Sequence, residues 1–181
     1  SVAEKNNLFN APETYMNKIS APVKEKNVID LDFTVKKNIS NLAEYMNKKP
    51  ENLTACILDR PRHKSIIEEL RYLKVNLKLI SDGDVSGALL VTDPKHNVDI
   101  FLGVGGGPEG VLAASALDSY GCFFQGKFIF DNDKDKLRAK EMGILDFQKK
   151  YELNEIVAGD SIFCATGITN GDLVSGIVVD N

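Results

Sequence analysis

Residues whose types suit phosphate and metal chemistry occur at three turns of this 181-residue chain. The first turn holds Arg60, Pro61 and Arg62, the second holds Asp82, Gly83 and Asp84, and the third holds the glycines of residues 103–107 followed by Glu109. Arginine is a fixed cation whose planar fork binds phosphate through two hydrogen bonds. Aspartates accept hydrogen bonds from sugar hydroxyls, and glutamate is a hard oxygen ligand for Mg²⁺ or Mn²⁺. Together the three turns predict a site for a phosphorylated polyol near a divalent metal.

Each turn also has a plainer interpretation when it is taken alone. Two arginines around a proline are often only a solvated loop. An Asp-Gly-Asp turn is often a helix cap, which stabilises a helix by about 1 kcal/mol. A glutamate at a helix start often interacts only with the helix dipole. The functional interpretation therefore depends on the three turns lying together.

The order of the predicted elements brings these turns together. The pattern predicts strands at residues 54–58, 75–80 and 98–102, followed by helices at residues 64–74, 85–91 and 108–120. Strands that alternate with helices are typical of α/β proteins with a mainly parallel sheet covered on both faces. Right-handed crossovers place the ends of successive parallel strands at one edge of the sheet. We therefore expect the three turns to line one cleft.

The glycine-rich turn is the stretch around which the chain is organised. Glycine lets the backbone turn sharply and lets a ligand approach the main chain. Pro108 suits the first turn of a helix, where a missing N–H costs little. The free N–H groups of that turn favour an anion. The pattern therefore predicts a strand, a glycine loop and a helix that displays Glu109 beside an anion site.

The other segments carry weaker signals. Alternating apolar and polar residues predict a strand over residues 28–33, and Thr34 is expected to cap a helix that ends near residue 48. Tyr15, judged by its neighbours alone, is interpreted as packed at an edge. We expect a strand at residues 122–130, a charged helix at 131–142, a strand and turn at 160–169 and a returning strand at 173–179.

Composition restricts the class of protein. A net charge of -4 without a basic run argues against a nucleic-acid role, and no apolar run is long enough to span a membrane. Cys56, Cys122 and Cys164 are widely spaced and lie in apolar runs. Their pattern predicts reduced, buried thiols rather than disulfides or a zinc site. We therefore expect a cytoplasmic protein that binds a small molecule, without a nucleic-acid or membrane partner.

Six motifs, in order and at matching spacing, closely resemble the class II fructose-1,6-bisphosphatases. They are NAPETYM at residues 10–16, ILDRPRH at 57–63, SDGDV at 81–85, GVGGGPEGV at 103–111, RAKEMGI at 138–144 and ATGITNGDL at 165–173. The resemblance implies the layered α/β fold of the inositol monophosphatase-like sugar phosphatases. It also implies hydrolysis of the 1-phosphate of fructose 1,6-bisphosphate with Mg²⁺ or Mn²⁺. Photosynthetic relatives also accept sedoheptulose 1,7-bisphosphate.

The resemblance also assigns roles to residues. It implies that Glu109 is a metal ligand and that the substrate-binding residues are Tyr15, Arg60, Pro61, Arg62, Asp82, Gly83, Asp84 and Gly106. For Tyr15 this replaces the interpretation as an edge residue. The family often has lysine where this chain has Arg60, which keeps the charge but changes the hydrogen-bonding geometry.

One departure from the family pattern is large. The Asp-Pro-Ile-Glu-Gly-Thr type motif, which supplies further metal carboxylates, does not occur in this chain. We expect residues 1–50 to be the end of an N-terminal phosphatase domain with its connecting helix. Residues 51–181 are expected to form a C-terminal substrate-binding domain, incomplete at its C-terminus. The catalytic residues remain unknown, and we expect a C-terminal fragment, inactive alone, of an enzyme that works as a homo-oligomer.

Two other interpretations stay open. The glycine-rich loop could belong to a nucleotide- or nicotinamide-binding domain, but the glycines do not follow the first strand of the chain. No acidic residue ends a following strand at the expected distance either. The chain could also be a sugar-phosphate binding module without catalytic activity. Metal-dependent phosphate release would separate that module from an enzyme.

Overall fold

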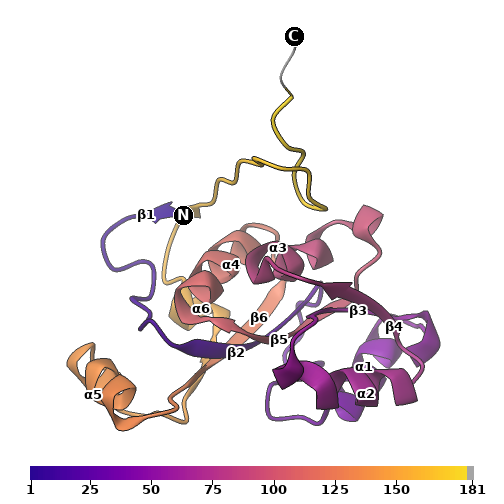
Figure 1. The fold of residues 1–181 in the computed structure, drawn as a ribbon, viewed down its shortest axis with the longest axis horizontal. Coiled ribbons are helices and arrows are strands. Elements are labelled where there is room, and N and C mark those ends of the chain that lie inside the picture. The colour runs from indigo at the N-terminus through magenta and orange to yellow at the C-terminus, as the bar shows by residue number, and fades with distance from the viewer. Residues whose placement is uncertain (179–181) are drawn as a thin grey trace.

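The structure is a computed structural model that describes residues 1–178 (Figure 1). Its strands are β1 Val2–Ala3, β2 Tyr15–Ala21, β3 Thr54–Leu58, β4 Asn76–Ile80, β5 Ile100–Gly106, β6 Phe123–Ile129, β7 Lys150–Glu152 and β8 Ser161–Ile162. Its α-helices are α1 Val35–Tyr45, α2 Lys64–Tyr72, α3 Asp84–Leu89, α4 Gly107–Ser119, α5 Asp133–Glu141 and α6 Leu153–Ile156. Short 3₁₀ turns, η1 Pro50–Asn52, η2 Pro61–His63, η3 Leu90–Thr92 and η4 Pro94–His96, join several of them. No helix of residues 1–178 is long and apolar enough to cross a membrane.

Six strands form one mixed sheet in the order β4-β3-β5-β2-β6-β7. The predicted α/β class is confirmed, and β4, β3 and β5 are parallel as expected. The prediction of a mainly parallel sheet is wrong for the other half, because β2 pairs antiparallel with both β5 and β6, and β6 pairs antiparallel with β7. Tyr15 begins this central strand rather than lying at an edge strand. Pairing with strands about a hundred residues away is a long-range property that local alternation does not encode.

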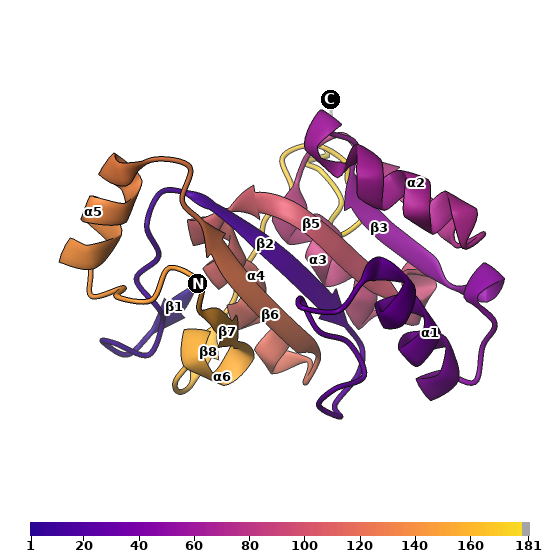
Figure 2. The same cartoon turned by 90° about the horizontal axis from the view of Figure 1, so that it is seen from below.

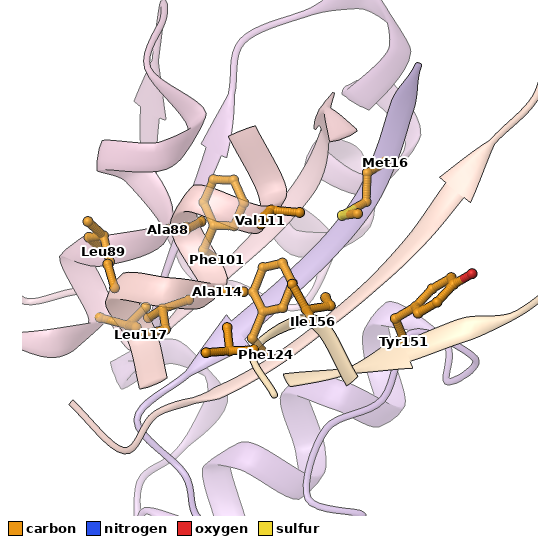
Figure 3. Packing of buried hydrophobic residues seen from close by; sticks show 14 of the residues in the cluster. Met16, Ala88, Leu89, Phe101, Val111, Ala114, Leu117, Phe124, Tyr151 and Ile156 are labelled. Carbon is orange, nitrogen blue, oxygen red and sulfur yellow. The ribbon is translucent and has the colours of Figure 1, made fainter. Parts of the chain in front are cut away.

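Two hydrophobic clusters lie on opposite faces of the sheet. Helices α3, α4 and α6 supply one cluster, in which Met16, Phe101 and Phe124 point from β2, β5 and β6 (Figure 3). Helices α1 and α2 supply the other, together with Ile19 of β2 and apolar residues of β3 and β5. Successive side chains of a strand point to opposite faces, so the central strands contribute to both clusters. Packing on both faces of the sheet holds the C-terminal ends of β3, β4 and β5 in place, and the three turns follow these ends.

Most predicted helices lie where they were expected. The Thr34 hydroxyl caps α1 by accepting a hydrogen bond from the Lys37 N–H at 3.1 Å. Helices α2, α3, α4 and α5 lie within or next to the predicted ranges. The predicted boundary near residue 50 stays a prediction. In the structure β2, from before that point, pairs with β5 and β6, from after it.

Three other expectations are corrected. Residues 28–33 form no strand, because side chains satisfy their backbone: Asn38 Oδ1 accepts from the Asp30 N–H at 2.8 Å, and Gln125 Oε1 accepts from the Leu31 N–H at 2.9 Å. Between residues 160 and 169 the only strand is the two-residue β8, which pairs with β1. Residues 173–178 form no strand, and Val179, the end of the predicted one, lies outside the described residues.

Candidate functional site

The three predicted turns lie at one edge of the sheet. Strands β4, β3 and β5 are parallel neighbours, so their C-terminal ends point the same way. The arginine turn follows β3, the Asp-Gly-Asp turn follows β4, and Glu109 lies in the first turn of α4 after β5. The turns lie at one edge of the sheet as expected, whereas the expectation that all three line one cleft stays a prediction.

The arginine turn is fastened to β5 where that strand separates from β3. Strands β3 and β5 pair only at Ala55–Ile100 and Cys56–Phe101. Beyond that point the backbone of Val104 is held by side chains: Arg62 Nε and Nη2 donate to the Val104 carbonyl at 3.0 and 2.8 Å. His63 Nε2 accepts from the Val104 N–H at 2.8 Å. The two side chains therefore take the place of a neighbouring strand.

His63 is a supporting residue to which sequence reasoning gave no role. It is fully buried, and its Nδ1 lies 2.7 Å from the Leu58 carbonyl. A carbonyl can only accept and the Val104 N–H can only donate, so the ring is neutral with its proton on Nδ1. Burial, together with Arg62 and Arg60, lowers the pKa of His63 and favours this form. The signal in the sequence is a histidine directly after the arginines, before an amphipathic helix.

Arg62 and Tyr15 meet at the N-terminal end of β2. The Arg62 guanidinium carbon lies 5.1 Å from the centroid of the Tyr15 ring, which orients the cation on the ring face. Tyr15 and Gly106 are register partners and line a cavity of about 400 Å³. Arg62 remains exposed, and its Nη1 group makes no hydrogen bond within the described residues. The structure therefore brings together an aromatic ring, a free N–H fork and glycine backbone.

The same cavity contains carboxylates that the sequence prediction missed. Glu13, Asp131 and Asp135 line it beside Tyr15 and Gly106. The sequence analysis placed both aspartates within a charged helix over residues 131–142 and gave them no role. Their oxygens can accept hydrogen bonds from hydroxyls but repel a phosphate. This part of the site therefore suits the polyol rather than the phosphate.

Arg60 and Pro61 lie apart from this cavity. Both line a second cavity of about 430 Å³ next to α2 and the end of β4. Arg60 is half-buried, and its Nη1 donates weakly to the Asp59 carbonyl at 3.4 Å. The two arginines of the turn therefore differ in place: Arg60 lines this second cavity, whereas Arg62 lies over the Tyr15 ring.

The Asp-Gly-Asp turn divides into an exposed and a buried carboxylate. Gly83 has φ +82°, a left-handed conformation that favours glycine. Asp82 is exposed and its Oδ1 accepts from the Gly83 N–H at 2.9 Å. Asp84, only 7% exposed, forms an ion pair with Lys18 of β2, which is only 1% exposed. Asp82 is therefore open to a ligand, whereas one oxygen of Asp84 is engaged inside the protein.

Lys18 is a second supporting residue that the sequence prediction missed. Its ammonium lies among glycines: a Cβ at residue 105 would overlap the Asp84 carboxylate and lie 3.1 Å from Lys18 Nζ. Burial lowers the pKa of Lys18 despite the opposing effect of Asp84. A lysine inside an otherwise buried strand, opposite a glycine run, is the signal that could have identified it.

The glycine run is strand rather than loop up to Gly106. The helix begins at Gly107, with Pro108 in its first turn as predicted. Glu109 is exposed, and its Oε2 accepts from the Gly106 N–H at 2.8 Å. In the part of the chain that the structure describes, no three His, Cys, Asp or Glu side chains are grouped to hold a metal. Within the described residues Glu109 is therefore not part of a group of three such side chains.

Comparison with known proteins identifies the family. The family model described as "Bacterial fructose-1,6-bisphosphatase, glpX-encoded" matches residues 1–181. The chain belongs to this family. The resemblance expected from the motifs is thereby confirmed.

Curated relatives of this fructose-1,6-bisphosphatase family chain carry one shared name. Proteins of Trichodesmium erythraeum and Synechococcus sp. strain JA-3-3Ab, each 36% identical, and of Crocosphaera subtropica, 37% identical, align over 98% of this chain. Each is named D-fructose 1,6-bisphosphatase class 2/sedoheptulose 1,7-bisphosphatase. The alignment covers 55% of each relative, so the chain spans about half the length of the curated relatives it matches.

Proposed function

We propose that this chain is the substrate-binding part of a metal-dependent phosphatase that hydrolyses the 1-phosphate of fructose 1,6-bisphosphate. Sedoheptulose 1,7-bisphosphate, named in the relatives, is the second proposed substrate. The observation that carries the proposal is the Arg62 fork beside Tyr15 and Gly106, in a chain of this family. The Arg62 fork would supply a phosphate ligand, and the Tyr15 ring would form a wall for the sugar. The Gly106 backbone allows a ligand to approach the main chain closely.

Each residue has a proposed role. Arg62 binds a substrate phosphate through the N–H groups that Val104 leaves free, and Arg60 with Pro61 extends the cationic turn on the α2 side. Asp82 accepts from a sugar hydroxyl, while Gly83 and the buried Asp84 hold that turn in place. The remaining contacts come from Tyr15 and Gly106.

Glu109 is proposed as one ligand of Mn²⁺ or Mg²⁺. A single carboxylate leaves such an ion mostly hydrated, because tight binding needs several oxygens in a fixed array. The remaining ligands would have to come from outside these residues. We therefore expect residues 1–181 to bind the sugar bisphosphate and not to hydrolyse it.

The domain organisation and the setting are also proposals. Residues 1–50 are proposed to be the end of an N-terminal phosphatase domain with its connecting helix, and residues 51–181 to belong to the substrate-binding domain. The whole enzyme is proposed to be a homo-oligomer in the cytoplasm. Three free cysteines, which suit a reducing compartment, support the proposed location.

The test is binding of fructose 1,6-bisphosphate to the chain, measured by titration calorimetry. We expect Arg62→Ala to lower the affinity about tenfold or more, because a hydrogen bond to a charged group is lost. Lys36→Ala is the control, since it removes an exposed cation of α1 that lines neither the Tyr15 cavity nor the Arg60 cavity. Equal affinity of Arg62→Ala and the unchanged protein would contradict the proposed site.

Phosphate release tests the catalytic part of the proposal separately. The chain is incubated with fructose 1,6-bisphosphate and Mn²⁺, and inorganic phosphate is measured. We expect no release above the metal-only background. Steady turnover would show that these residues contain a complete catalytic site.

A further inference from the structure

The turn that carries the proposed phosphate ligand ends on a histidine whose ring faces inward. His63 is the N-cap residue of α2 and is fully buried. Its ring makes both of its hydrogen bonds to the sheet, with the Leu58 carbonyl of β3 at 2.7 Å and the Val104 N–H of β5 at 2.8 Å. The ring therefore links the strand that precedes the arginine turn to the strand that precedes Glu109.

The ring lies where β3 and β5 separate. Figure 2 shows β5 with β2 on one side and β3, next to α2, on the other. Val104 pairs with Asn17 on the β2 side, whereas the pairing of β3 with β5 ends at Phe101. A Cβ at Gly103 would lie 3.4 Å from two atoms of the His63 ring, and this glycine has φ +154°. Glycine therefore lets the ring lie directly against the strand.

The position of the Arg62 guanidinium depends on the Val104 backbone. Arg62 Nε and Nη2 both donate to the Val104 carbonyl, at 3.0 and 2.8 Å. Arg62 is exposed, and ordering a long side chain costs conformational entropy that these two bonds must offset. Since both donors meet one carbonyl, a shift of that carbonyl would move the guanidinium away from the Tyr15 ring.

The same short piece of β5 leads to the other end of the proposed site. Gly106 follows Val104 in β5, and its N–H donates to Glu109 Oε2 at 2.8 Å. The glutamate and the arginine turn are thus both hydrogen-bonded to residues 104–106. His63 and Arg62 make the bonds on the side where β3 has ended its pairing.

We propose that His63 is a positioning residue of the substrate site, which holds Val104 where the Arg62 guanidinium can bind the sugar phosphate. This inference rests on the proposed function and adds a residue that acts on the ligand only through Arg62. A histidine that merely filled the space between the strands would contribute to stability and leave the affinity of the folded chain unchanged. The two roles therefore make different predictions for binding.

Two amide side chains that differ by one methylene group separate these roles. In His63→Gln the longer amide reaches the place of Nε2 and can accept from the Val104 N–H, whereas in His63→Asn the shorter amide can only donate to the Leu58 carbonyl. The measurement is titration calorimetry with fructose 1,6-bisphosphate. We expect His63→Gln to retain the affinity and His63→Asn to lower it about three- to tenfold, within the loss expected for Arg62→Ala.

A double-variant cycle shows whether the histidine acts through the arginine. In the Arg62→Ala background, His63→Asn should lower the affinity no further, because the group that it positions is absent. Ile39→Val is the control for stability alone, since it removes a buried methyl group between α1 and the sheet. It should lower the midpoint of urea unfolding without changing the affinity.

Outcomes separate this inference from the function on which it rests. If Arg62→Ala weakens binding while His63→Asn binds like the unchanged chain, His63 is structural only and the proposed function stands. Additive losses from Arg62→Ala and His63→Asn would also overturn the inference, since His63 would then act by another route. If the unchanged chain does not bind the bisphosphate, both are overturned.

A measurement on the unchanged chain avoids any dependence on how the variants fold. NMR of nitrogen-15-labelled protein detects the bond from the Val104 N–H to His63 Nε2 as a scalar coupling between the two nitrogens. We expect this coupling to persist when the chain is saturated with fructose 1,6-bisphosphate. Loss of the coupling in the complex would show that the bound site does not use the histidine, and would overturn the proposal.

Discussion

The side chains of His63 and Arg62 both form hydrogen bonds with the backbone of Val104 in β5. His63 accepts a hydrogen bond from the Val104 N–H, and Arg62 donates to the Val104 carbonyl. Both contacts lie where β3 no longer pairs with β5. An imidazolium could not accept the Val104 N–H, so the support depends on the neutral ring. The backbone on which the Arg62 guanidinium is held is thus supported by one protonation state of His63.

This coupling predicts a pH-dependent stability. Burial places the folded-state pKa of His63 below the unfolded value of about 6.5, so the unfolded chain takes up the proton first. The stability due to His63 is complete above about pH 6.5 and is lost as the pH falls toward the folded pKa. We expect the free energy of unfolding, from urea titrations between about pH 7 and 5, to fall less steeply in His63→Gln. Equal slopes in His63→Gln and in the unchanged protein would contradict this coupling.

Gly105 is the second residue whose identity the structure explains. An alanine there would overlap the carboxylate of the buried Lys18–Asp84 pair. We expect Gly105→Ala to lower the free energy of unfolding by about 1–3 kcal/mol in urea denaturation, as for other overpacked sites. Gly106→Ala is the matched control, because the three atoms nearest to its added methyl all belong to the exposed Glu109 side chain, which can turn away. Equal losses in the two variants would contradict this explanation.

At the scale of elements, the Lys18–Asp84 pair joins the central strand β2 to the first residue of α3. The two residues are separated by 66 positions in sequence, and both side chains are buried. A buried charge pair fixes a geometry more than it adds stability, because desolvation opposes the attraction. The pair thereby fixes the Asp-Gly-Asp turn against the glycine strand.

Breaking this pair should be costly. Lys18→Met leaves the Asp84 carboxylate buried without a partner, and we expect a loss of about 3–5 kcal/mol in the free energy of unfolding. The double variant Lys18→Met with Asp84→Leu should recover part of that loss, since no buried charge remains. Lys48→Met is the control: Lys48 pairs with Asp99 at 2.6 Å but is 35% exposed, so its loss should be smaller. A double variant no more stable than Lys18→Met would refute the argument.

At the scale of the whole molecule, a hydrophobic cluster lies on each face of the sheet. The three cysteines lie in different environments. Cys56 is buried, Cys122 is half-buried and Cys164 is exposed. The expectation that all three thiols are buried is therefore wrong for Cys164 and only partly right for Cys122. Burial raises the pKa of Cys56 to about 12 and also raises that of Cys122.

These environments predict an order of thiol modification. With iodoacetamide at about pH 8, Cys164 should react first, because it is accessible, and Cys122 more slowly. Cys56 should react only when the chain is unfolded in denaturant, as read by mass spectrometry of peptides. Cys164→Ser should remove the fast phase alone. Rapid labelling of Cys56 in the native protein would contradict the packing of the cluster around it.

The sequence by itself determined the elements whose signals are local. The Thr34 cap, the apolar stripe of α2, Pro108 at the start of α4 and the runs of β3, β4 and β5 are each encoded within a few residues. The alternation of strands and helices then predicted that the three turns lie at one edge of the sheet. The motifs gave the family.

Only the tertiary structure decided which distant segments meet. Local pattern cannot specify that β2 lies antiparallel between β5 and β6, because a strand's period is the same for every partner. Residues 28–33 have strand-like alternation, yet Asn38 and Gln125 satisfy their backbone instead of a sheet neighbour. Lys18 with Asp84 likewise acquires its meaning from a contact between distant segments. Charge and hydrogen bonding act through space, so their partners become visible only once the strands are in register.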